Sequence, residues 1–177
     1  MYGTFDCDYQ TTIGIDYLSK ALAVDERIVR FQMWDTAGQE KFRSLVSSYV
    51  RDSEVVIIMY DITRRKSFVT LDKWIDDARA HSPKNCLIYI VGGKSDMADE
   101  RAVTVEEGEN AAAAYNVKFK ETSAKLNLGV TPLFKMIADD LYVRDNGIEP
   151  PDLTEVPLKL APRKASDAKK PASKCAC

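Results

Sequence analysis

A short run of polar residues, 35–40, follows a segment whose side chains alternate between polar and apolar as those of a strand do. A carboxylate such as Asp35 at the end of a strand can hold Mg²⁺, usually through water. Gly38, three residues on, lets a backbone N–H approach a phosphate, and Gln39 beside it could orient an attacking water. Asp and Gly are equally ordinary in a plain strand-to-loop turn, so the spacing alone leaves both interpretations open.

Two later loops carry groups that suit a purine base. The Asp96 carboxylate could accept hydrogen bonds from the N1–H and N2–H₂ edge of guanine, and the Lys94 stem could pack on the ring. The segment that contains Ser123, Ala124 and Lys125 could offer backbone amides to a purine oxygen. Lys-Ser-Asp is a common loop sequence, so these residues carry little weight when taken alone.

Thr12 is a second candidate oxygen ligand for Mg²⁺. It lies in polar surroundings ahead of a predicted strand, where its hydroxyl could bind the ion when a γ-phosphate is present. It is equally explained as a β-branched residue that enters a strand.

Alternating strands and helices must position these residues. Runs 55–60 and 86–91 are apolar and rich in β-branched side chains, which is typical of strands buried on both faces of a parallel sheet. Apolar residues recur at helical spacing in 71–78 and 130–141, and Thr104 with Glu107 predicts a capping box. The order predicts an α/β fold with helices on both sheet faces and ligands beyond the carboxyl ends of the strands.

Composition excludes several classes of protein. The 177 residues include 25 basic and 27 acidic side chains, a net charge of −2 that does not suit a general nucleic-acid binder. The hydrophobic fraction of 45% is typical of a domain with a real core. No apolar stretch approaches the roughly 20 residues of a membrane-spanning helix. Four cysteines, two of them at the very end, form no disulfide framework and favour a reducing compartment.

The chain divides near residue 145. We expect a globular body over residues 1–145 and a flexible tail over 146–177, because five of the seven prolines lie in the tail and no amphipathic period survives there. Residues 161–177 carry five basic side chains against one acidic one, which is a net charge of +4. This asymmetry suggests an anionic partner, although the lysines could simply keep the tail soluble.

Together these strings resemble a small GTPase of the Ras superfamily, and specifically a Rab, over about residues 1–143. The string TIG from Thr12 resembles switch I, and WDTAGQE from Trp34 resembles the start of switch II. KSD from Lys94 and ETSAK from Glu121 resemble the two guanine-specifying motifs, while IGIDY, KFRSL and YDIT give Rab character. The strings TIGIDYLSK, RSLVSSYVRDS and KWIDDAR are most similar to the Rab subgroup that serves Golgi membranes and retrograde traffic.

The resemblance implies a three-layer, P-loop GTPase-like parallel sheet that binds GTP or GDP with Mg²⁺. It implies that Gln39 positions the attacking water and that Thr12 and Asp35 hold the metal. The residues implied to hold the nucleotide are Gly38, Lys94, Asp96, Ser123, Ala124 and Lys125. The residues implied to form an effector surface are Ile15, Tyr17, Trp34 and Tyr49, whose rings are also explained by ordinary packing.

The last residues resemble the Rab Cys-x-Cys terminus, on which Cys175 and Cys177 are both geranylgeranylated. Two lipid chains beside five basic residues would anchor the protein stably to a membrane. A two-thiol metal or redox site is the alternative, but two ligands on a tail form no closed site. The implied partners are effectors, exchange factors, GTPase-activating proteins, GDP-dissociation inhibitor, the prenylation machinery and a membrane, and no nucleic acid. The implied location is the cytoplasmic face of Golgi or vesicle membranes, with a cytosolic pool.

The sequence departs from the family pattern in two respects. No G-x-x-x-x-G-K-[ST] phosphate loop occurs in it, and the family's first strand would precede Met1. We therefore expect an incomplete reading frame and poor folding of these residues alone. Gly93 stands where the family has Asn, and losing such a buried hydrogen bond costs about 1–3 kcal/mol, or roughly tenfold to a hundredfold in affinity.

Two functions follow from these observations. The first is a GTP/GDP switch in vesicle trafficking that hydrolyses GTP slowly. The second is a non-catalytic, membrane-tethered effector-binding module without a phosphate site.

Overall fold

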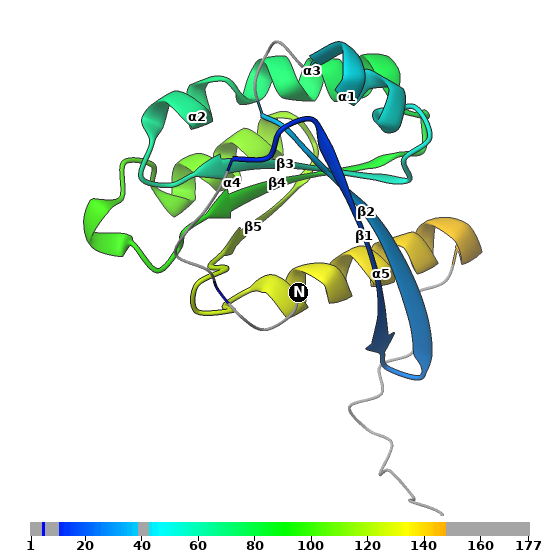
Figure 1. Ribbon diagram of the computed structural model, residues 1–177. Helices are drawn as coiled ribbons and strands as arrows, with labels where there is room; N and C mark the ends of the chain where they lie inside the picture. The colour runs from blue at the N-terminus through cyan, green and yellow to red at the C-terminus, as the bar shows by residue number, and fades with distance from the viewer. Residues whose placement is uncertain (1–4, 6–10, 39–42, 148–177) are drawn as a thin grey trace, which may run out of the picture.

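Two separate β-sheets organise the chain in the computed structural model, which describes residue 5 and residues 11–38 and 43–147 (Figure 1). Strands β1 (Ile15–Val24) and β2 (Arg27–Thr36) form an antiparallel hairpin. Strands β3 (Val55–Asp61), β4 (Leu87–Gly93) and β5 (Lys118–Thr122) form a parallel sheet in that order. No backbone pairing joins the two sheets within these residues.

The parallel sheet confirms the predicted α/β class. Strand β4 lies in its middle, and four of its residues in succession, Tyr89 to Gly92, are buried. Ile58 of β3 pairs with Ile90 of β4, which pairs in turn with Phe119 of β5. Runs of β-branched residues suit such a strand because both of its faces are covered.

Helices cover both faces of this sheet, as predicted, and Figure 1 shows α3 and α5 on opposite sides of it. One face packs against α3 (Leu71–His81) and α4 (Val105–Ala114), and its core includes Ile58, Ile75 and Ile90. The other face packs against α5 (Val130–Asn146), where Tyr89 and Ile137 share a second core. Two short helices, α1 (Arg43–Val50) and α2 (Arg65–Val69), flank α3.

The ends of α4 and α5 follow from local sequence. Thr104 and Glu107 form the predicted capping box, in which the Glu107 N–H donates to Thr104 Oγ1 at 3.1 Å and the Thr104 N–H donates to Glu107 Oε2 at 2.9 Å. Gly147 closes α5 with φ 66°, a left-handed conformation that glycine adopts without cost. None of the described helices is long and apolar enough to cross a membrane.

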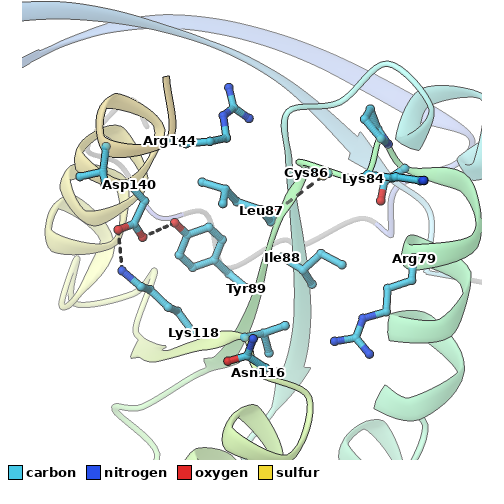
Figure 2. Close-up of a pocket in the computed structure, with 14 residues that line it drawn as sticks. Arg79, Lys84, Cys86, Leu87, Ile88, Tyr89, Asn116, Lys118, Asp140 and Arg144 are labelled. Atoms are coloured by element: carbon cyan, nitrogen blue, oxygen red, sulfur yellow. Dashed lines mark hydrogen bonds and ion pairs between the residues drawn. The ribbon is translucent and has the colours of Figure 1, made fainter. Parts of the chain in front are cut away.

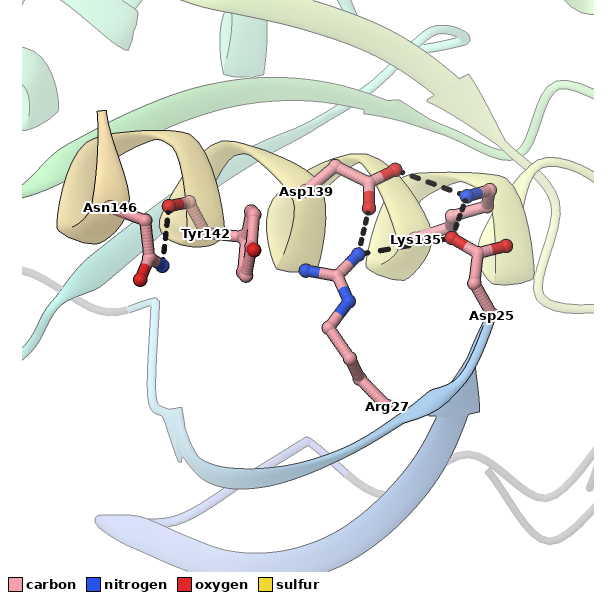
Figure 3. Close-up of polar contacts among 6 residues, drawn as sticks. All are labelled: Asp25, Arg27, Lys135, Asp139, Tyr142 and Asn146. Atoms are coloured by element: carbon pink, nitrogen blue, oxygen red, sulfur yellow. Dashed lines mark hydrogen bonds and ion pairs between the residues drawn. The ribbon is translucent and has the colours of Figure 1, made fainter. Parts of the chain in front are cut away.

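The hairpin is attached to α5 through side chains at its turn (Figure 3). Arg27 donates to Asp139 at 2.7 Å and lies 4.4 Å above the Tyr142 ring. Lys135 bridges Asp25 at 2.8 Å and Asp139 at 3.2 Å. Asp25 has φ 54°, which this residue type tolerates in a tight turn. The turn is therefore held mainly by half-exposed charged groups.

One aromatic contact adds to this attachment. Phe31 in the middle of β2 meets Phe134 of α5 edge to face, with ring centroids 5.1 Å apart. The sequence predicted a strand over 27–34 and another strand after Thr12, but it did not predict that the two pair antiparallel.

Candidate functional site

The carboxyl ends of the three parallel strands meet at one edge of the sheet. Asp61, the last residue of β3, pairs with Gly93 at the end of β4, and Gly93 pairs with Thr122 at the end of β5. The loops that follow these strands therefore leave the sheet side by side. In open α/β sheets this edge is where ligands bind.

Two strands extend further than predicted. Gly92 and Gly93 belong to β4, and Glu121 and Thr122 belong to β5, although the sequence patterns placed both pairs in loops. Backbone pairing continues in register through these residues, and pairing depends on the neighbouring strands rather than on local propensity. Asp35 likewise lies within β2, opposite Asp16 of β1, rather than after the strand.

The structure brings Asp96 and Ser123 together. The fully buried Ser123 hydroxyl donates to Asp96 Oδ1 at 2.6 Å and accepts from the Leu126 N–H at 3.0 Å. The Ser95 N–H donates to the Thr122 carbonyl at 3.0 Å, which fixes the two loops to each other. Within the described residues Asp96 Oδ2 accepts no hydrogen bond. This arrangement holds a carboxylate in a defined position with one oxygen available to a ligand.

Lys94 lies beside Asp61 at the same edge. Its Nζ lies 2.8 Å from Asp61 Oδ2, and its backbone adopts φ 66°. Burial opposes ionisation of Asp61, but hydrogen bonds from Lys94 and Thr63 prevail and lower the pKa of this carboxyl. No motif in the sequence marks Asp61 as a functional residue, although its place at the end of a buried strand is a signal that could have found it.

Glycine at position 93 is not required by packing. A Cβ there would lie 3.4 Å from the Tyr60 carbonyl oxygen and 3.6 Å from Met59 Cε, which is ordinary contact. At the neighbouring Gly92, a Cβ would lie 3.0 Å from Tyr60 Oη and 3.2 Å from Glu121 Cγ, which is much tighter. Position 93, at the end of β4, can therefore carry a side chain, whereas position 92 resists one.

The segment with Ala124 and Lys125 is an exposed loop anchored at both ends. Ser123 and Leu128 exchange backbone hydrogen bonds at 2.9 and 3.0 Å. Gly129 closes the loop with φ 72°, and a Cβ there would lie only 2.5 Å from the Glu121 carbonyl oxygen. The anchored loop can present backbone amides beside Asp96.

The hairpin brings Thr12 and Asp35 together. The Thr12 hydroxyl donates to Asp35 Oδ2 at 2.8 Å on an exposed surface. The Ala37 N–H donates to the Gly14 carbonyl at 2.9 Å and so ties the segment before β1 to the segment after β2. At Gly38, no atom of the described residues lies within 4 Å of the place that a Cβ would take.

The Thr12–Asp35 pair supplies some of the oxygen ligands that a hard cation needs. A hydroxyl and a carboxylate are oxygen donors of the kind that Mg²⁺ accepts alongside waters and substrate phosphates. The described residues hold no cluster of three or more acidic, histidine or cysteine side chains suited to a metal. A cation here would therefore depend on oxygens from water and a ligand. Gln39, Cys175 and Cys177 lie outside the described residues.

Three aromatic side chains form a continuous surface next to the Thr12–Asp35 pair. Tyr17 and Trp34 are cross-strand partners with ring centroids 4.7 Å apart, and Trp34 lies 4.8 Å from Tyr49 of α1. Tyr17 is 44% exposed and Trp34 is 46% exposed, so this is not a closed core. Ile15, predicted as part of the same surface, is half-buried opposite Thr36.

The predicted residues thus fall into two groups. Among the described side chains, no hydrogen bond or ion pair joins the Thr12–Asp35 pair on the hairpin to Asp96 and Ser123 on the parallel sheet. The first group carries oxygens suited to a cation, and the second carries the acceptor suited to a purine edge.

Comparison with known families identifies the class of protein. The model of the Ras family matches residues 1–143, which is most of the chain. The protein therefore belongs to the Ras family, whose members are small GTP-binding switch proteins. Proteins of this family bind GTP and GDP, typically with Mg²⁺, and act through regulators and effectors.

Proposed function

We propose that this Ras-family protein is a Rab-like GTP/GDP switch that acts in vesicle trafficking at the cytoplasmic face of Golgi or vesicle membranes. The Rab-type strings around Ile13, Lys41 and Tyr60 support this subgroup. The exposed surface of Tyr17, Trp34 and Tyr49 supports an effector-binding role, because aromatic side chains dominate the energetics of protein interfaces.

The position of the Asp96 carboxylate is the main observation that supports the proposal. Ser123 positions its Oδ1 and leaves Oδ2 available at the ligand edge of the sheet. Oδ2 can accept from one guanine donor and the second lone pair of Oδ1 from the other, so this carboxylate can bind both N1–H and N2–H₂ of guanine, whereas adenine presents no such pair of donors. The Lys94 stem and the amides around Ala124 and Lys125 would complete a guanine pocket.

The contacts with the metal and the phosphates would come from the hairpin and the residues next to it, and not from the loops that would hold the base. Thr12 and Asp35 would hold Mg²⁺, which when bound neutralises charge on the β- and γ-phosphates. Gly38 would offer its backbone N–H to a phosphate, and Gln39 would orient a water for slow hydrolysis. The printed sequence contains no G-x-x-x-x-G-K-[ST] string, so the proposal assigns no residue to the cradle that this string forms.

A second candidate is a non-catalytic effector-binding module. Two of the three aromatic side chains, Tyr17 and Trp34, are register partners in the hairpin, and Tyr49 of α1 packs on Trp34. A protein of this kind would bind effectors without discriminating between GTP and GDP.

Membrane attachment would be provided by the tail. We include geranylgeranylation of Cys175 and Cys177 in the proposal, with GDP-dissociation inhibitor and the prenylation machinery as partners. Exchange factors, GTPase-activating proteins and effectors would act on the nucleotide-dependent surfaces, as for other switches of this family.

The test is a competition experiment on the full chain with Mg²⁺, with fluorescent GDP as the probe. GDP should displace the probe and ADP should not. Asp96→Asn should weaken GDP and favour xanthosine diphosphate, because the Asn amide N–H₂ can donate to the C2 carbonyl of xanthine. Asp99→Asn, a change at an exposed carboxylate in the same loop, is the matched control and should leave the preference unchanged.

Two outcomes would count against the switch. If the chain binds GDP and ADP equally, or if Asp96→Asn leaves the preference unaltered, Asp96 does not read the base. If the chain binds no nucleotide but still binds an effector, the non-catalytic module replaces the switch.

A further inference from the structure

A cavity of about 560 Å³ lies at the end of the parallel sheet opposite the ligand edge (Figure 2). It is formed by the end of α3, the starts of β4 and β5, and the last turns of α5. Leu87, Ile88 and Val117 give it an apolar floor, and the free Cys86 thiol also faces it. None of the roles proposed above uses this cavity.

Basic side chains dominate the ionisable groups of the lining. Four are cations, namely Arg79, Lys84, Lys118 and Arg144, against the single carboxylate of Asp140.

Two of these four cations already form ion pairs with carboxylates. Lys118 pairs with Asp140, and Arg144 pairs with Asp145 at 2.7 Å. Arg79 donates to a backbone carbonyl, which carries no formal charge. Over the described part of the chain, no carboxylate forms an ion pair with Arg79 or Lys84. The cavity therefore has two cations free to attract an anionic group.

The chain itself leaves α5 beside this cavity. Val143 and Arg144 belong to the lining, and the Gly147 N–H donates to the Val143 carbonyl at 2.7 Å. Gly147, the last residue that the structure describes, thus lies within about one helical turn of the cavity. The left-handed backbone of Gly147 ends the helix and lets the chain turn away from its axis.

The composition of the next nine residues complements the cavity. Residues 148–156 read IEPPDLTEV, with three carboxylates and no basic side chain. Residues 157–177 have the opposite character, with six basic side chains and one acidic one. Nine extended residues reach about 30 Å, which is ample for a site that starts at the same helix end.

We propose that residues 148–156 dock in this cavity, with carboxylates of Glu149, Asp152 and Glu155 at Arg79 and Lys84 and with apolar side chains on its floor. Tethering favours this occupant, because a segment joined by a short linker has an effective concentration in the millimolar range. An anionic phospholipid headgroup could use the same cations, but it lacks this tether. The basic remainder of the tail is repelled from the cavity and stays available to an anionic surface.

The labelling rate of Cys86 in the full chain tests the proposal. Cys7, Cys175 and Cys177 are replaced by Ser so that an uncharged alkylating reagent reports Cys86 alone. Burial raises the pKa of the Cys86 thiol, so the variants are compared at a pH where lysine stays protonated, and each rate constant is divided by the thiolate fraction of that variant measured by ultraviolet absorbance.

Reversing the tail charges with Glu149→Lys, Asp152→Lys and Glu155→Lys should raise the labelling rate on the order of fivefold, because a few exposed ion pairs are lost. Arg79→Glu with Lys84→Glu should produce the same rise, and combining both sets should restore protection. Lys169→Glu, Lys170→Glu and Lys174→Glu in the basic part of the tail form the matched control and should leave the rate unchanged.

Two results would overturn the proposal. An unchanged labelling rate after charge reversal in 148–156 would mean that this segment does not occupy the cavity. Protection that requires phosphatidylserine vesicles and ignores the reversal would assign the cavity to a lipid headgroup instead.

Discussion

The two sheets of this protein are stabilised in different ways. In the parallel sheet, the central strand β4 buries four consecutive residues between two layers of helices. In the hairpin, only Val24 is buried among the ten residues of each strand. The first region depends on apolar packing, which salt does not screen, and the second depends largely on ion pairs at its turn, which salt does screen.

The two halves of the candidate site lie in these two differently stabilised regions. The purine acceptor Asp96 is fixed by the buried Ser123 in the closely packed region. Thr12 and Asp35, the oxygens suited to a cation, belong to the weakly attached hairpin. A site divided in this way can keep its base contacts while its metal contacts move, which is what a switch requires.

The largest difference in the free energy of unfolding should appear when an isoleucine is truncated to alanine in each of the two regions. Ile90→Ala removes a fully buried side chain from the central strand and should lower the free energy of unfolding by about 3 kcal/mol. Ile28→Ala, at a hairpin position that is 82% exposed, should change it by less than about 0.5 kcal/mol. Urea unfolding followed by circular dichroism measures both, and equal losses would refute the contrast.

The Asp61–Lys94 pair tests the ligand edge of the parallel sheet. Because the folded-state pKa of Asp61 is lowered, its stabilisation is complete above the unfolded value near 4 and is lost as pH falls through the folded pKa. Asp61→Asn should cost about 2 kcal/mol at pH 7, and the two proteins should converge in acid. Urea midpoints across this pH range measure it. A constant difference at all pH values would mean that charge is not responsible, and Asp99→Asn supplies the baseline.

Position 93 tests whether the side chain that glycine lacks there limits the affinity of the parallel sheet for the guanine base. Gly93→Asn adds an amide where a Cβ meets only ordinary contacts, and it should raise guanine nucleotide affinity by about tenfold. Titration with fluorescent GDP measures this change. Gly92→Ala is the contrasting variant, because its Cβ would press on Tyr60, and it should give no gain. An unchanged affinity in the Gly93→Asn variant would show that the loops lack the geometry to use the amide.

The smallest effect should come from the attachment of the hairpin. Arg27→Ala removes the Asp139 ion pair and the contact with Tyr142, and it should cost about 0.5–1 kcal/mol at low salt. Amide hydrogen exchange in β1 and β2 should accelerate while exchange in β4 stays the same. Arg30→Ala, at an exposed position on the same strand, is the control. If 1 M salt leaves the Arg27 effect undiminished, packing rather than charge holds the hairpin.

Sequence patterns predicted the parallel sheet because its strands are apolar on both faces, and they predicted the start of α4 from Thr104 and Glu107. They missed the ends of β4 and β5, since the last residues of β4 are two glycines whose pairing is decided by neighbouring strands. The Lys135–Asp25 contact spans 110 residues between ordinary surface charges, so no local signal marks it. Motif likeness placed Asp96 and Ser123 in one site, but their direct hydrogen bond emerged only from the fold.

The positions of the two tryptophans have a practical consequence. Trp34 lies between Tyr17 and Tyr49 on the hairpin surface, 46% exposed, whereas Trp74 of α3 packs against the core of the parallel sheet. Each region therefore carries its own intrinsic fluorophore, one partly in water and one in an apolar setting. Trp34→Phe leaves the emission of Trp74 alone, and Trp74→Phe does the reverse. The order in which the two regions come apart can thus be followed optically, without any attached dye.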